Sequence, residues 1–111
     1  MPLHEDWEVT PREAARLLRE GAVLIDVREE SEWKTARVEG AILAPLGSLR
    51  ERADDIEALD DADHVLVICH HGRRSLQGAA ILREKGIAGA MSVAGGIDLW
   101  SVAVDAGVPR Y

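Results

Sequence analysis

Aromatic residues are scarce in this chain of 111 residues, which has no phenylalanine, one tyrosine and three tryptophans. Residues of the AVILMFWYC set still make up 47% of the sequence, so the core must be built from alanine, valine, isoleucine and leucine. The length fits one compact domain, and we expect residues 1–111 to form it.

Cysteine is equally scarce, because Cys69 is the only one. A lone thiol excludes an intramolecular disulfide, a Cys-x-x-Cys redox pair and a zinc site made of thiolates alone. Residues 1–6 lack the basic and apolar segments of a signal peptide, and no apolar run approaches the ~18 residues that a membrane span needs. We therefore expect a cytoplasmic protein that does not enter a membrane.

Basic residues are outnumbered, with 13 lysines and arginines against 20 aspartates and glutamates and a formal net charge of −7. So acidic a chain is a poor candidate for following a nucleic-acid backbone or binding an anionic membrane. The acid-rich stretch at residues 51–63 is expected to be a solvated face, with docking of a basic partner as the alternative.

Helix signals and apolar runs alternate along the chain. Thr10 to Glu13 has the pattern of a capping box and Gly21 stands where that helix should end, while residues 48–51 show a second capping pattern. Strands are expected at 8–9, 22–27, 41–44, 64–69 and 90–93, with helical stretches at 11–20, 29–36, 49–59, 75–85 and 97–102. This alternation predicts an α/β fold, a three-layer domain with a five-stranded, mainly parallel sheet flanked by helices on both faces.

One loop collects the reactive side chains: Cys69-His70-His71-Gly72-Arg73-Arg74-Ser75 joins a buried strand to a helix. Ligands of open parallel sheets bind beyond the carboxyl ends of the strands, so we expect the Cys69 thiol to face a crevice. The free N–H groups of the helix start and the two arginines favour the thiolate form and an anionic substrate. The alternative is an inert, buried cysteine at a strand end.

This loop resembles the active-site loop of the rhodanese family, through the pattern Cys69-x-x-Gly72-x-Arg74-Ser75. The resemblance extends over about residues 8–109 and includes LIDVR at 24–28, VEGAILAP at 38–45 and GGIDLW at 95–100. A histidine commonly precedes the second of these segments in the family, whereas this chain has Arg37 or Val38 there.

The resemblance implies a single rhodanese-like domain that acts as a thiosulfate sulfurtransferase and needs no cofactor. Cys69 is then expected to take a sulfane sulfur from thiosulfate or a persulfide donor, and to pass it from a persulfide to cyanide or a thiol. The partners implied are a small anionic donor and such an acceptor, with a protein donor or acceptor also open. The expected substrate-binding residues are His70, His71, Gly72, Arg73, Arg74 and Ser75.

Other residues near the loop have supporting interpretations. Asp26 and Arg28 end a neighbouring strand and are expected to form an ion pair that braces the site. Ser75 is expected to cap the following helix, with contact to the sulfur as the alternative. No metal is expected, because Cys69 and the two adjacent histidines on one tight loop cannot all point inward.

Three other functions remain open from the sequence. The domain could be a sulfur-relay carrier for a biosynthetic partner, a non-catalytic binding module, or a cysteine phosphatase or arsenate reductase of the same fold. Loop length disfavours the last group, whose loops have five residues between cysteine and arginine, whereas four separate Cys69 from Arg74. A shorter loop encloses a smaller cradle, which suits one sulfur atom better than a tetrahedral oxyanion.

Overall fold

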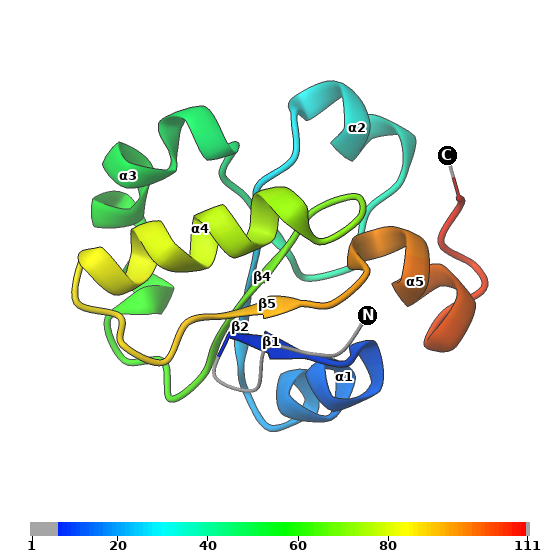
Figure 1. Cartoon of the computed structure of the whole chain (residues 1–111), viewed down its shortest axis with the longest axis horizontal. Helices are drawn as coiled ribbons and strands as arrows, with labels where there is room; N and C mark the ends of the chain where they lie inside the picture. Colours follow the sequence, from blue (N-terminus) through cyan, green and yellow to red (C-terminus); the bar gives the residue numbers. More distant parts are fainter. Residues whose placement is uncertain (1–6, 111) are drawn as a thin grey trace.

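A five-stranded sheet organises the computed structural model, which describes residues 7–110 of the chain. The strands are β1 (Glu8–Val9), β2 (Val23–Asp26), β3 (Ile42–Leu43), β4 (Val65–Ile68) and β5 (Met91–Val93). They lie in the order β1-β5-β4-β2-β3, and every neighbouring pair is parallel (Figure 1). The predicted α/β fold with a parallel sheet is therefore confirmed, while the expectation for residues 1–6 lies outside the described residues.

Five α-helices connect and cover the strands. They are α1 (Pro11–Arg19), α2 (Glu30–Thr35), α3 (Leu49–Arg52), α4 (Arg73–Glu84) and α5 (Gly96–Ala103), and 3₁₀ turns span Leu46–Ser48, Ala53–Asp55 and Glu57–Leu59. The start of α1 is as predicted, because the Thr10 hydroxyl accepts a hydrogen bond from the Glu13 N–H at 3.1 Å. None of these helices, within residues 7–110, is long and apolar enough to cross a membrane.

The second predicted capping box is wrong. The Ser48 hydroxyl donates to the Pro45 carbonyl at 3.3 Å and does not cap a helix. The chain is already folded as a 3₁₀ turn before Ser48, so this residue lacks the extended backbone that an N-cap needs. The acidic residues that follow, in 51–63, are all exposed, which confirms the expected solvated face.

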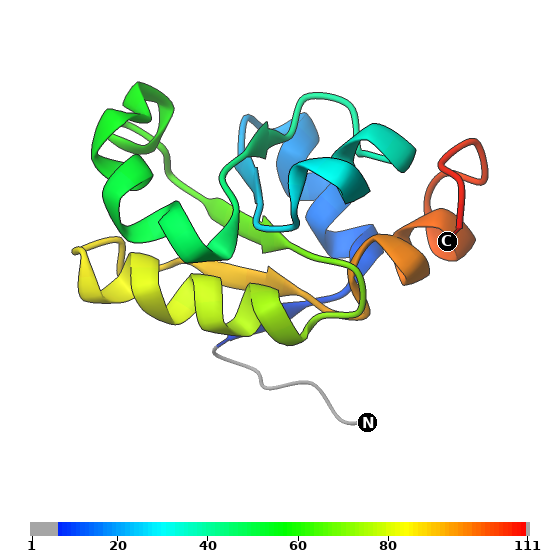
Figure 2. The ribbon, with the colours of Figure 1, turned by 90° about the horizontal axis from the view of Figure 1, so that it is seen from above.

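Alternate strand residues face opposite layers of helices, as the pleat of a sheet requires. Ile25, Val65 and Val67 pack with residues of α3 and α4, whereas Leu24 and Leu66 pack with residues of α1 and α5. Figure 2 shows α4 on one side of the sheet and α1 on the other. The predicted three-layer arrangement is therefore present, and both central strands are buried on both faces.

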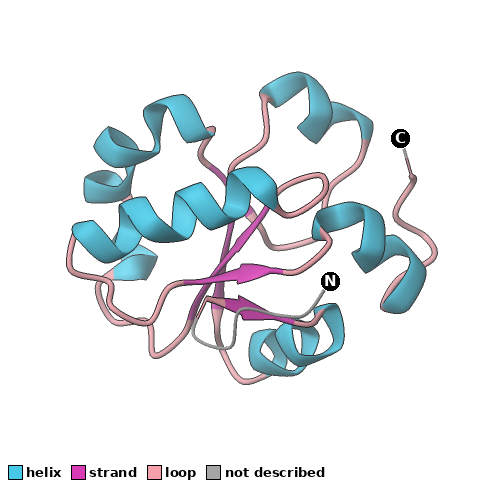
Figure 3. Ribbon diagram, in the orientation of Figure 1, coloured by secondary structure: helices cyan, strands magenta, loops and turns pink. Residues whose placement is uncertain are grey.

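The parallel sheet brings together the two loops that follow β2 and β4, at the carboxyl ends of these strands. Asp26 lies beside Ile68 in the β2–β4 register, so the segments that follow these two strands start side by side. Figure 3 shows that these connections leave the sheet at the same end. The loop that carries Cys69 is therefore next to the end of β2, where Arg28 stands.

Candidate active site

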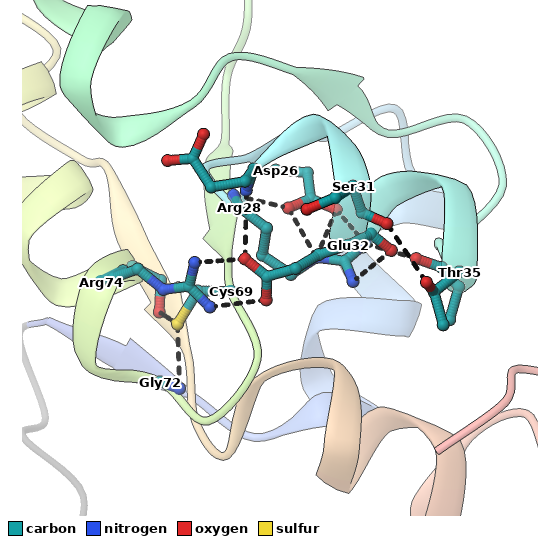
Figure 4. Close-up of polar contacts among 11 residues, drawn as sticks. Asp26, Arg28, Ser31, Glu32, Thr35, Cys69, Gly72 and Arg74 are labelled. Atoms are coloured by element: carbon teal, nitrogen blue, oxygen red, sulfur yellow. Dashed lines mark hydrogen bonds and ion pairs between the residues drawn. The ribbon is translucent and has the colours of Figure 1, made fainter. Parts of the chain in front are cut away.

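Cys69 directly follows β4 and exposes 1% of its surface. The prediction that its thiol faces an open crevice is therefore wrong. The chain turns back over the sulfur, so that the Gly72 N–H donates to Cys69 Sγ at 3.0 Å (Figure 4). The loop thus buries the Cys69 thiol and also donates a hydrogen bond to its sulfur atom.

Gly72 makes this turn possible. Its φ of +104° lies in the left-handed region, and it is the N-cap residue of α4. A Cβ atom here would lie 3.1 Å from the backbone nitrogen of Gly95, so a side chain would also be crowded. The N–H group at the start of a helix carries partial positive charge, which stabilises an anionic sulfur at this position.

Ser75 is the second group on the sulfur. It lies in the first turn of α4 rather than at its cap, because the helix starts at Arg73, two residues earlier than predicted. The cap assignment is therefore wrong and the alternative is right: Ser75 Oγ lies 3.3 Å from Cys69 Sγ. It also lies 2.6 Å from the hydroxyl oxygen of Ser92 on β5, and both serines are fully buried.

Arg74 points to a carboxylate that the sequence analysis missed. Its two terminal nitrogens lie 2.6 and 2.8 Å from the two oxygens of Glu32 on α2, in a bidentate ion pair (Figure 4). The charge of Arg74 is therefore matched by an acid beside the loop, whereas the sequence predicts it to be a source of positive charge for an anionic substrate. Arg73, the neighbouring residue, is exposed.

The predicted ion pair between Asp26 and Arg28 is present and fully buried, with Arg28 Nη2 at 2.7 Å from Asp26 Oδ2. Arg28 also donates to the carbonyl oxygens of Glu32 at 3.3 Å and Ala36 at 2.6 Å. This pair therefore fixes α2 against the end of β2.

The two histidines stack on each other, with ring centroids 3.9 Å apart. His71 is exposed and His70 is half-buried, which places them at the rim of the loop. Within residues 7–110, no three His, Cys, Asp or Glu side chains gather in a group that could hold a metal ion.

Comparison with known proteins identifies the family. The Rhodanese-like domain family matches residues 10–103 of the chain. This protein belongs to the rhodanese-like domain family. The relatives of this rhodanese-like domain include the thiosulfate sulfurtransferase GlpE of Pseudomonas entomophila, with 34% identity over 88% of the chain and 87% of GlpE.

Longer relatives and solved structures agree with this assignment. The putative sulfur carrier protein YrkF of Bacillus subtilis is 33% identical over 70% of the chain, but the match spans 40% of YrkF. The match to the maize protein MOCS3-2, an adenylyltransferase and sulfurtransferase, spans 24% of that protein. The human single-domain sulfurtransferase TSTD1 superposes with a TM-score of 0.75, at 29% identity over 86% of this chain and 96% of TSTD1.

The closing motif of this rhodanese-like domain holds the Cys69 loop through two backbone hydrogen bonds. The N–H groups of Ile97 and Asp98, at the start of α5, donate to the carbonyl oxygens of Cys69 and His70 at 2.7 and 3.1 Å. Gly96 permits this approach, since a Cβ atom there would lie 2.3 Å from the Cys69 carbonyl oxygen. The carbonyls of Cys69 and His70 are thereby satisfied, while the Gly72 N–H of the same loop donates to the sulfur.

The same helix carries an exposed ion pair. Asp98 accepts hydrogen bonds from Arg110 at 2.9 and 3.1 Å. This hydrogen bonding lowers the pKa of the Asp98 carboxyl, and the positive charges of Arg110 and of the nearby His71 act in the same direction.

Proposed function

We propose that this protein is a thiosulfate-type sulfurtransferase with Cys69 as its nucleophile. The Cys69 thiolate attacks the outer sulfur of thiosulfate, the S–S bond of the donor breaks, and sulfite leaves with the bonding electrons. Cyanide or a thiol then attacks the outer sulfur of the persulfide, and the Cys69 thiolate is regenerated. The observation that carries this proposal is the sulfur held at 3.0 Å by a helix-capping N–H in the loop that matches the family.

The residues of the loop have distinct roles in this proposal. Gly72 and Ser75 contact the sulfur and stabilise its negative charge, as an oxyanion hole does for oxygen. His70, His71 and Arg73 form the rim that meets the anionic donor.

Two ion pairs support the loop in this proposal. Arg74 contributes through its pair with Glu32, while Arg28, held by Asp26, keeps α2 in place. Both pairs thereby order the loop and do not touch the transferred sulfur.

The burial of the sulfur means that the loop must open before a donor can reach it. Because Cys69 exposes 1% of its surface, a donor reaches it when residues 70–72 move apart. A small anion needs a smaller opening than a protein side chain does, which favours thiosulfate or a persulfide as the donor. A free, reduced thiol also fits the cytoplasmic location that we propose.

A sulfur-relay function is the second candidate, and the match to the putative sulfur carrier YrkF favours it. In that case the same Cys69 persulfide forms, but the sulfur comes from or goes to a protein. The two functions differ in their kinetics. A relay carrier takes sulfur faster from a persulfidated cysteine desulfurase than from thiosulfate, and a thiosulfate sulfurtransferase shows the reverse order.

Intact-mass spectrometry after exposure of the reduced protein to thiosulfate tests the proposed chemistry. We expect a gain of one sulfur atom, about 32 Da, that cyanide removes. Cys69→Ser is expected to keep the fold and to show no gain, because the substitution changes one atom. A wild-type protein that gains no sulfur from thiosulfate or from a persulfide donor would contradict the function.

A further inference from the structure

Ser92 lies at the end of a chain of polar groups that starts at the nucleophile. Cys69 Sγ is 3.3 Å from Ser75 Oγ, which is 2.6 Å from Ser92 Oγ. All three residues are buried, with 1% exposure for the cysteine and none for the serines. Ser92 comes from β5 and not from the loop, so it belongs to neither the motif nor the helix that follows it.

The backbone holds Ser92 rigidly. Its N–H donates to the Trp7 carbonyl at 2.6 Å, and its Cα pairs with Glu8 on β1 and Val67 on β4. A residue fixed in the interior of a sheet keeps its hydroxyl at one place relative to α4. Ser92 is thus pre-positioned to orient a group on that helix.

The hydrogen-bonding capacity of Ser92 decides which group donates at each of the contacts between Cys69, Ser75 and Ser92. Within residues 7–110, the Ser92 hydroxyl has one hydrogen-bond partner, the Ser75 hydroxyl. When Cys69 is protonated, its thiol donates to Ser75 Oγ and Ser75 donates to Ser92, so within residues 7–110 the buried Ser92 proton has no acceptor, which is unfavourable. When Cys69 is a thiolate, Ser92 donates to Ser75 and Ser75 donates to the sulfur, and both hydroxyl protons have an acceptor.

We propose that Ser92 is a positioning residue that turns the Ser75 hydroxyl toward the sulfur and so favours the anionic forms of Cys69. In the thiolate form the sulfur accepts from both Gly72 N–H and the Ser75 hydroxyl, whose oxygen lies 3.3 Å away. When the thiol loses its proton to solvent, the two O–H bonds rotate and no covalent bond in the serines changes. The hydrogen bonds from Gly72 and Ser75 then stabilise the negative charge of the thiolate. That they also stabilise the Cys69 persulfide rests on the proposed function.

The rate of alkylation of Cys69 by iodoacetamide at neutral pH tests this role, because the thiolate is the form that reacts and the chain has no other cysteine. We expect Ser92→Ala to lower this rate roughly fivefold, the effect of one ordinary hydrogen bond. Ser92→Thr keeps the hydroxyl and is expected to restore part of the rate. Ser101→Ala is the matched control, since Ser101 is also buried but donates to the Val108 carbonyl, and it is expected to react as wild type.

A double variant separates positioning from a general structural effect. If Ser92 acts through Ser75, Ser75→Ala/Ser92→Ala is expected to react no more slowly than Ser75→Ala alone. Multiplied effects of the two substitutions, or a Ser92→Ala rate equal to that of wild type, would overturn the proposal. Alkylation needs no sulfur donor, so a failure of this inference and a failure of the sulfurtransferase function give different results.

Discussion

Two arginine–carboxylate pairs flank α2, and they differ in burial. Asp26 and Arg28 are fully buried, whereas the side chains of Glu32 and Arg74 are 20% and 34% exposed. The buried pair holds the carbonyl oxygens of α2, and the outer pair joins a side chain of α2 to the helix that carries the active-site loop. The inner pair therefore connects the sheet to α2, and the outer pair connects α2 to the loop.

The difference in burial suits the inner pair to a structural role and the outer pair to a role in the proposed function. A buried charge without its partner is strongly destabilising, so the inner pair cannot exchange partners during a reaction. A partly exposed pair is weaker and is closer to the solvent from which an anionic donor arrives. A third pair, Asp98 with Arg110, is more exposed still, with side-chain exposures of 25% and 61%.

Breaking the inner pair is expected to have the largest effect. Arg28→Met leaves the Asp26 carboxylate buried without its partner, so the free energy of unfolding should fall by about 3–5 kcal/mol. Urea denaturation followed by circular dichroism measures this loss. Arg50→Met is the control, because it breaks an exposed pair with Glu84 and should cost less than about 1 kcal/mol. Equal losses in the two variants would show that burial does not set the strength of these pairs.

Breaking the outer pair is expected to affect sulfur loading more than stability. Arg74→Ala removes one positive charge next to the Glu32 carboxylate and makes the net charge beside the loop more negative, so persulfide formation from thiosulfate should slow by roughly tenfold at low salt. Stopped-flow measurement of sulfite release gives this rate.

The double variant Arg74→Ala/Glu32→Gln sharpens this test. It removes both charges and is expected to recover most of the lost rate, because the excess carboxylate has gone. A double variant as slow as Arg74→Ala would mean that the guanidinium itself contacts the donor. Raised ionic strength should narrow the difference between Arg74→Ala and wild type, since salt screens the charge.

The exposed pair is expected to give the smallest effect and a clear pH dependence. The Arg110 hydrogen bond lowers the pKa of Asp98 below its usual 3.8. Its contribution to stability is therefore present above the usual pKa and is lost as the pH falls through the lower, folded value. In an NMR titration, Arg110→Ala should raise the pKa of Asp98, whereas Arg12→Ala, which changes an exposed arginine on α1, should not. An unchanged Asp98 pKa in Arg110→Ala would contradict this assignment.

Local patterns in the sequence were sufficient for most of the fold. The alternation of apolar runs and helices predicted the five-stranded sheet, and Thr10 and Gly21 marked the ends of α1. Ser48 was misassigned because it is the last residue of a 3₁₀ turn and so lacks the extended backbone of an N-cap. Ser75 was misassigned because α4 starts at Arg73, two residues early, directly after Gly72, whose positive φ no local pattern requires.

The candidate site was predictable only where it lies in one segment. The Cys69 loop stood out as a motif, but its burial depends on contacts from α5 that are remote in sequence. Glu32 and Ser92 were missed for the same reason, since they reach the loop from α2 and β5. Both had a weak signal: Glu32 is an acid just after a strand-end arginine, and Ser92 is a polar residue inside an apolar strand.

The hold of α5 on the loop also bears on the order in which the protein matures on the ribosome. The carbonyls of Cys69 and His70 find their N–H partners only at residues 97 and 98, in a segment that follows the loop along the chain. During translation the thiol therefore emerges well before the segment that shapes its surroundings. A nascent chain truncated before α5 would carry Cys69 without these two hydrogen bonds to its loop, so the surroundings of the proposed nucleophile are complete only after α5 has been synthesised.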